Sequence, residues 1–215
     1  MGLDLFPEAK AKPGHDVGWR QLVQRYFNGE ELADEAKARF GEISIPPYQT
    51  IDAPRVGYDD AANQWIIKTR KAQTKEEIAD CLKSFHGYYA LALVGPPGIP
   101  RYSNAGLGYG VDETSFRGSF LNECKSLLDE KFLAQAWKNM WPEEAVVYGR
   151  RLLQIADAAA RRQTPTPSFL ERLGLRKKAA AVVTKEVDTP IDILRAAGEW
   201  YIFWAERGHP IRAWF

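Results

Sequence analysis

Residues 189–208 read TPIDILRAAGEWYIFWAERG, and this stretch predicts a buried C-terminal helix. Its later turns, residues 200–204, are apolar on every side, and a helix without a polar face is buried in a core or in an oligomer contact. Gly208 and Pro210 end this helix, at about Arg207. The tail that follows, 211–215, is too aromatic for a free end, so we expect it to dock on the chain.

Helical spacing of apolar residues recurs through most of the chain. Residues 74–77 form a capping box, in which the Thr74 hydroxyl and the Glu77 carboxylate each satisfy a free backbone N–H. Pro142 suits the first position of a helix, and the residues after it form a clear packing stripe. The expected helices cover residues 16–27, 31–40, 74–87, 112–128, 132–140 and 142–163.

Residues 43–70 predict strands instead. Val56 and Tyr58 alternate with smaller or polar residues, and residues 65–68 are rich in strand formers. Between them, 59–63 has the composition of a turn, so the pattern predicts a hairpin. A third strand over 88–94 is expected to pair with it.

The fold expected from these patterns is α+β: one mainly helical globular domain over residues 1–215, with a small antiparallel sheet in the N-terminal half. Aromatic residues supply ample bulk for its core. The 29 Lys and Arg residues nearly balance the 28 Asp and Glu residues, so no overall charge attracts nucleic acid or an anionic membrane.

The sequence favours a soluble protein of the cytoplasm. The N-terminus lacks a basic segment followed by an apolar stretch, and the longest apolar runs are far shorter than the ~20 residues that span a bilayer. The two cysteines, Cys81 and Cys124, fall in expected helices, where a small buried thiol is the ordinary outcome. We therefore expect no membrane segment.

The least periodic stretch of the chain runs from Gly95 to Gly110. Loops longer than about 12–15 residues are uncommon in compact domains and tend to be functional or disordered. This segment and its flanks concentrate tyrosine, arginine and hydrogen-bonding side chains beside glycines, which favours a binding surface. The candidate binding residues are Tyr88, Arg101, Tyr102, Asn104, Tyr109 and Asp112.

The leading hypothesis is a non-enzymatic module of the inhibitor or immunity kind that uses residues 95–117 to bind a protein partner. The alternative is a small enzyme acting on an anionic or sugar-like substrate, with His86, Glu113 and Arg117 as candidate catalytic residues in one cleft. A plainer interpretation is that Asp112 and Glu113 begin a helix, with Arg117 paired to Glu113. Homodimerisation through the aromatic C-terminal helix is compatible with either hypothesis.

Other motifs predict little chemistry. The glycines of 106–110 have the spacing G-x-G-x-G, which differs from the dinucleotide fingerprint, so we expect no cofactor. The three histidines lack metal-ligand spacing, and no nucleophile elbow surrounds a serine, so no metal is expected. Residues 150–178 hold eight basic side chains against two acidic ones. Phosphate binding would explain that patch, but a solvated helix face with a loop explains it equally well. We therefore do not expect nucleic acid as a partner.

Overall fold

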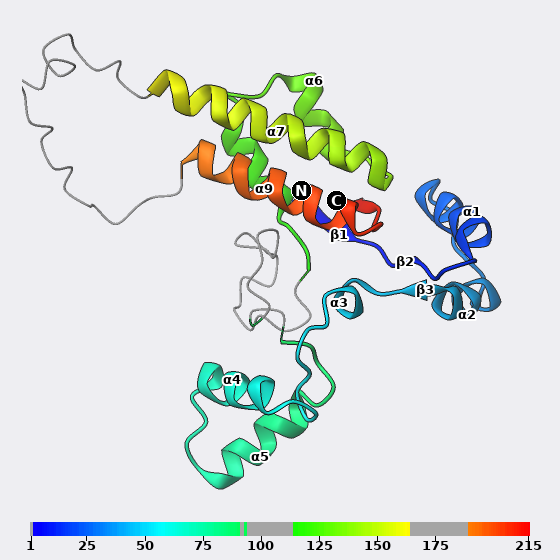
Figure 1. The fold of residues 1–215 in the computed structure, drawn as a ribbon, viewed down its shortest axis with the longest axis vertical. Helices are drawn as coiled ribbons and strands as arrows, with labels where there is room; N and C mark the ends of the chain where they lie inside the picture. The colour runs from blue at the N-terminus through cyan, green and yellow to red at the C-terminus, as the bar shows by residue number, and fades with distance from the viewer. Residues whose placement is uncertain (1, 91–92, 94–113, 164–188) are drawn as a thin grey trace, which may run out of the picture.

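The computed structural model describes residues 2–90, 93, 114–163 and 189–215 (Figure 1). These residues are mainly helical with small antiparallel sheets, so the predicted α+β class is confirmed. The described elements in chain order are β1 (Asp4–Pro7), β2 (Lys10–Ala11), α1 (Asp16–Phe27), α2 (Asp34–Ile43), β3 (Ser44–Ile45), α3 (Pro47–Thr50), α4 (Asp60–Arg70), α5 (Lys75–Ser84), η2 (Gly118–Cys124), α6 (Glu130–Leu133), η3 (Ala134–Trp137), α7 (Pro142–Gln163), α9 (Pro190–Glu206) and β4 (Ile211–Trp214).

The largest hydrophobic core lies where α7 and α9 run side by side (Figure 1). Thr189 and Asp192 form a capping box at the start of α9, and Pro190 occupies its first turn. Trp200, Tyr201 and Trp204 have no exposed surface, so the predicted burial of this helix is confirmed. These aromatic rings are covered by the chain's own residues, and dimerisation through α9 stays a prediction.

Strand β1 pairs with β4 and so joins the two ends of the chain. The pairing is antiparallel, from Asp4 opposite Trp214 to Pro7 opposite Ile211. Ile211 also exchanges backbone hydrogen bonds of 2.8 Å with Met140, just before α7. The predicted docking of the tail is therefore confirmed, although it occurs through the backbone and Ile211 while the Trp214 and Phe215 rings stay largely exposed.

Helices α1 and α2 enclose a second, smaller hydrophobic cluster of Trp19, Leu22, Val23 and Ile43. The stop predicted after α1 is confirmed, because Gly29 adopts a left-handed φ of 82°. The second helix begins at Asp34 and continues through Gly41, which the sequence predicted as its end. We refer to α1, α2 and the segment that joins them as the α1–α2 lobe. Next to it, β2 pairs with β3 and forms the small antiparallel sheet in the N-terminal half.

The hairpin predicted within 43–70 is wrong, because residues 60–70 form helix α4. Its start has turn-like composition since Asp59 occupies the N-cap and Asp60 the first turn, where acidic residues are favoured. Ala62 and Ile66, one helical turn apart, are fully buried against α5.

The capping box predicted at Thr74 is present and begins α5. Of the third strand expected over 88–94, the described part contributes one bridge, Arg55 opposite Tyr89.

The helix expected over 112–128 is also corrected in its described part. Phe116 exchanges two backbone hydrogen bonds of 2.8 Å with Leu5, which hold the chain extended before Gly118. A short 3₁₀ helix, η2, follows, and Asp129 then caps α6 near the break that the sequence predicted. A Cβ at Gly118 would lie 2.6 Å from the Leu3 side chain, so a glycine permits this close approach.

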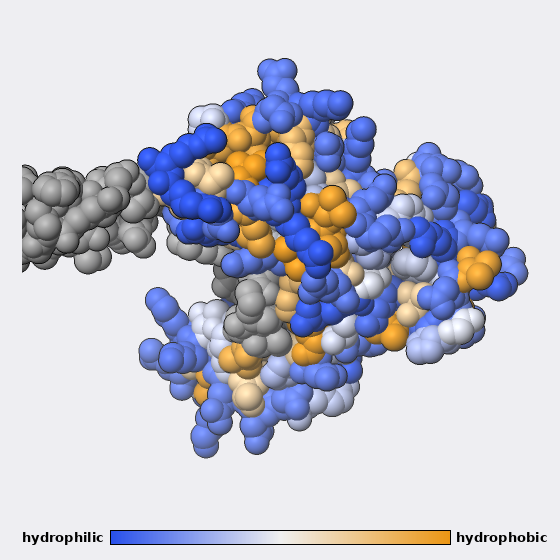
Figure 2. All heavy atoms as spheres, turned by 45° about the horizontal axis from the view of Figure 1, so that its top comes forward, coloured by the Kyte–Doolittle hydropathy of each residue, from blue (hydrophilic) through white to orange (hydrophobic). Residues whose placement is uncertain are grey.

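Hydrophobic and hydrophilic residues are mixed on the face shown in Figure 2, where apolar patches surface between charged side chains. Val147 on α7 is the most exposed apolar residue of the groove that runs beside this helix, at 68%. Among the described helices, none combines the length and the apolar character that crossing a membrane requires.

Candidate functional site

Arg55 and four ring-bearing side chains form a cluster at the junction between α3 and the α4–α5 helix pair. The Arg55 guanidinium lies over the ring of Tyr58 at 4.7 Å and over the ring of Tyr89 at 5.2 Å. Each of these tyrosine rings contacts one further ring: Tyr89 stacks on Tyr48, and Tyr58 packs against His86. We refer to Tyr48, Arg55, Tyr58, His86 and Tyr89 as the Arg55 cluster.

Backbone hydrogen bonds fix the position of Arg55. Its Nε donates to the Gly87 carbonyl at 2.7 Å, and its backbone N–H donates to the Asp59 carboxylate at 2.7 Å. Two backbone hydrogen bonds join the segment around Val56 to the segment at residues 87–88. The Val56 N–H donates to the Tyr88 carbonyl, and the Gly87 N–H donates to the Val56 carbonyl. The guanidinium is thus held in one orientation by its ring contacts and by the backbone.

Gly57 is required for the approach of His86. Its φ of 87° is in the left-handed region, and a Cβ there would lie 2.4 Å from Cδ2 of the His86 ring. Gly87 has a similar φ of 89° beside the Arg55 guanidinium. Both turns of this cluster therefore use the conformational freedom of glycine.

The outer edge of the cluster is accessible to a partner. Tyr58 is 64% exposed, and the adjoining Tyr88 is 45% exposed. Tyr88 packs edge-on against Phe85, and the Arg70 guanidinium lies 4.7 Å from the Phe85 ring centroid. An exposed aromatic surface on an ordered backbone is the chemistry of a recognition site more than of proton transfer.

The sequence named His86 as a catalytic candidate and Tyr88 as a binding candidate in this region, and the flank of 95–110 that it singled out also includes Tyr89. It missed Arg55 and Tyr58 because the incorrect hairpin treated residues 55–58 as an ordinary strand, and it gave Tyr48 no role. No local pattern in the sequence indicates that residues 55 and 89 meet, because the bridge between them joins distant segments of the chain. The remaining binding candidates, Arg101, Tyr102, Asn104, Tyr109 and Asp112, lie outside the described residues.

The catalytic alternative required His86, Glu113 and Arg117 in one cleft. His86 packs against Tyr58, whereas Arg117 pairs with Asp4 of β1 at 3.6 Å. Glu113 lies outside the described residues, as does its expected pairing with Arg117. The shared cleft stays a prediction.

The basic patch of 150–178 is described as far as α7 extends. Two ion pairs join this part of α7 to α9: Arg150 lies 3.4 Å from Glu206, and Asp157 of α7 itself lies 3.3 Å from Arg195. Arg161 and Arg162 are exposed. The four basic residues from 172 to 178 lie outside the described residues, so the prediction about nucleic acid stays open.

Neither cysteine of the chain is in a disulfide, and they differ in environment. Cys124 is fully buried, and burial raises the pKa of its thiol to about 12, so the thiolate is disfavoured there. Cys81 is half-buried on α5. Within the described part of the chain, no group of three His, Cys, Asp or Glu side chains is placed to hold a metal ion.

Comparison with protein-family models, with curated protein sequences and with solved structures finds no match to this chain. Its function is therefore inferred from its own residues.

Proposed function

We propose that the chain is a non-enzymatic binding module of the cytoplasm, of the inhibitor or immunity kind, which recognises a protein partner through the Arg55 cluster and through residues 95–117. The observation that carries this proposal is the fixed Arg55 guanidinium between two tyrosine rings, with Tyr58 exposed at the outer edge. Tyrosine and arginine are the residue types enriched at the centres of protein interfaces.

The order of the cluster supports binding on energetic grounds. Side chains that must be immobilised on binding cost about 0.5–1.5 kcal/mol each. Arg55 is already held by the Gly87 carbonyl and by Tyr58 and Tyr89, so it loses little further conformational entropy on binding. Tyr58 itself has a rigid ring with few rotatable bonds, and it offers both apolar area and a hydroxyl.

The experiment is quantitative capture of partners from a lysate of the source organism, with tagged wild-type chain, Tyr58→Ala and Phe215→Ala as baits. Tyr58 and Phe215 have matched exposures of 64% and 63%, but Phe215 lies at the C-terminus, outside the cluster. We expect one protein partner whose affinity falls about tenfold or more with Tyr58→Ala and is unchanged with Phe215→Ala. Circular dichroism and thermal unfolding of each bait establish that it is folded.

The same capture tests the contribution of residues 95–117 through a double substitution, Arg101→Ala with Tyr102→Ala. Loss of the same partner with this variant and with Tyr58→Ala would support one continuous surface. A partner that is retained equally by all the baits would refute the proposed surface.

A further inference from the structure

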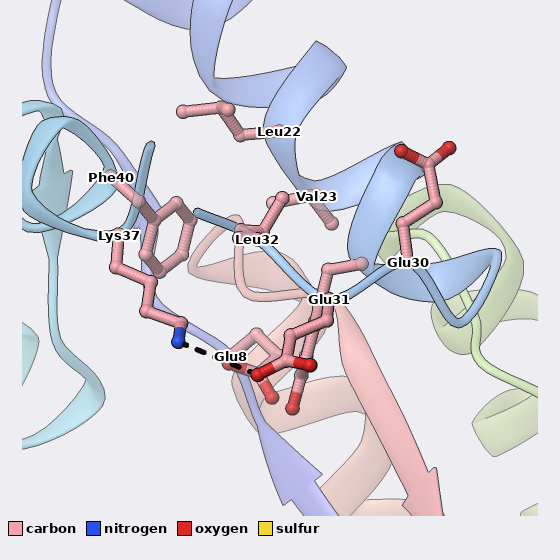
Figure 3. Close-up of a pocket in the computed structure, with 9 residues that line it drawn as sticks. Glu8, Leu22, Val23, Glu30, Glu31, Leu32, Lys37 and Phe40 are labelled. Carbon is pink, nitrogen blue, oxygen red and sulfur yellow. Dashed lines mark ion pairs between the residues drawn. The ribbon is translucent and has the colours of Figure 1, made fainter. Parts of the chain in front are cut away.

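A cavity of about 380 Å³ lies in the α1–α2 lobe, and it shares no residue with the Arg55 cluster (Figure 3). Four apolar residues form its wall: Leu22, Val23, Leu32 and Phe40. Leu22 and Val23 come from α1, Phe40 comes from α2, and Leu32 comes from the segment that joins these helices. Its size falls within the roughly 300–1,000 Å³ of small-molecule sites, and its wall has the apolar character typical of them.

The charged residues that line this cavity are predominantly acidic. Glu8, Glu30 and Glu31 contribute three carboxylates, and Lys37 contributes one ammonium group. These groups also pair with neighbours: Arg212 with Glu8, Arg25 with Glu30 and Asp34 with Lys37. With those partners included, four carboxylates face three cations, so one negative charge is left in excess. A single positive charge on a ligand would balance it.

Glu31 is the carboxylate best placed to meet such a charge. Figure 3 shows the Lys37 ammonium directed towards it from α2. The two groups are 4.0 Å apart, and the Glu31 side chain is 93% exposed, so this pairing is weak and the carboxylate is free to turn towards a ligand. Glu8 contributes a second carboxylate, although Arg212 already holds it at 2.5 Å.

Two aromatic rings complete the environment of the cavity. Tyr26 and Phe40 both line it, and the face of an aromatic ring attracts a cation through its quadrupole, as the Tyr26 ring already does with the Arg212 guanidinium 5.5 Å from its centroid. Apolar walls, aromatic faces and an acidic rim are together the recognition chemistry of an organic cation with an apolar body.

We propose that this cavity is a binding site for an organic amine, whose apolar body packs against Leu22, Val23 and Leu32 while its cationic head meets Glu31. The site lies in a different lobe from the surface proposed for the protein partner, so each proposal stands or fails separately.

The first test is titration of 2-phenylethylamine into the full chain by isothermal calorimetry. Two probes of similar shape are compared with it: neutral 2-phenylethanol and anionic phenylacetate. We expect saturable binding of one amine per chain, an affinity about two- to fivefold weaker for the alcohol, and no measurable binding of phenylacetate. Methyl resonances of Leu22, Val23 and Leu32 should shift during the amine titration. Absence of saturable amine binding, or equal affinity for the three probes, would overturn the proposal.

The second test reverses one charge at the rim. Glu31→Lys should weaken amine binding at least about fivefold, because it replaces attraction by repulsion at the head group. Glu35→Lys is the matched control, since Glu35 is also exposed and acidic but does not line the cavity. Equal losses with both variants would mean that the amine senses only the general surface charge, which contradicts a defined site.

Discussion

His209 shows how a single buried side chain connects distant segments of this chain. It has no exposed surface, and its ring packs against Trp204. Its Nδ1 lies 2.7 Å from the Glu8 carbonyl, and its Nε2 lies 2.8 Å from the Thr50 hydroxyl. Because a carbonyl only accepts, Nδ1 carries the proton and Nε2 accepts from Thr50. This neutral ring therefore links the segment after β1, helix α3 and the start of the C-terminal tail.

At this residue we predict a stability that falls as the pH falls from about 6.5 to 4. Burial lowers the pKa of His209 to about 4, and the cations of Lys10 and Arg207 add to the lowering. The unfolded chain, in which the pKa of histidine is about 6.5, then takes up the proton first, so up to about 3 kcal/mol of unfolding free energy is lost across this window. Urea unfolding at a series of pH values measures the loss.

His209→Gln isolates this contribution, because the variant removes the titrating ring and keeps every other ionisable group. Glu8 is the main neighbour to consider. Burial raises the pKa of Glu8 despite the opposing charge of Arg212, which gives a pH dependence of opposite sign in both proteins. An unchanged pH dependence in the variant would show that His209 is not the source.

At the scale of elements, two glycines decide how closely α7 and α9 pack. A Cβ at Gly149 would lie 2.8 Å from the Gly198 carbonyl oxygen, and a Cβ at Gly198 would lie 2.8 Å from the Gly149 carbonyl oxygen. The obstacle in each case is backbone, which cannot rotate away as a side chain does. The two helices therefore cross with their backbones almost in contact.

We predict that Gly198→Ala lowers the free energy of unfolding by about 1–3 kcal/mol, as expected for overpacking. Gly41→Ala in α2 is the control, because nothing lies within 4 Å of the Cβ it would add. That substitution should leave stability unchanged or raise it by up to about 1 kcal/mol, since alanine favours helix. Chemical unfolding of both variants measures the difference, and equal effects would argue against the close crossing.

The elements that the sequence predicted well are those defined by local signals. The capping box at Thr74, the Pro142 start of α7 and the apolar turns of α9 all depend on residues within a few positions of one another. Helix α4 was missed because an acidic N-cap and first turn have the same composition as a hairpin turn. The spacing of Ala62 and Ile66 was the local signal that favoured helix.

At the scale of the whole molecule, the described residues form three hydrophobic clusters of unequal size. Strands β1 and β4 close the largest of them, although they are separated by some two hundred residues. No periodicity within either strand indicates its partner, so this pairing could not be predicted. The candidate site was predicted only in part. Tyr88 and His86 were found from the composition of their segment, whereas Arg55 was missed because it joins them through a bridge between distant segments.

The most direct test of the Arg55 cluster as a protein-binding surface is photo-crosslinking from position 58 in cells of the source organism. A benzophenone side chain at this exposed position should form one adduct with a protein partner, and the same group at Phe215 should not form that adduct. A position-58 adduct that disappears when unlabelled wild-type chain competes is the predicted result. No adduct at position 58, or identical adducts from both positions, would contradict the proposed function.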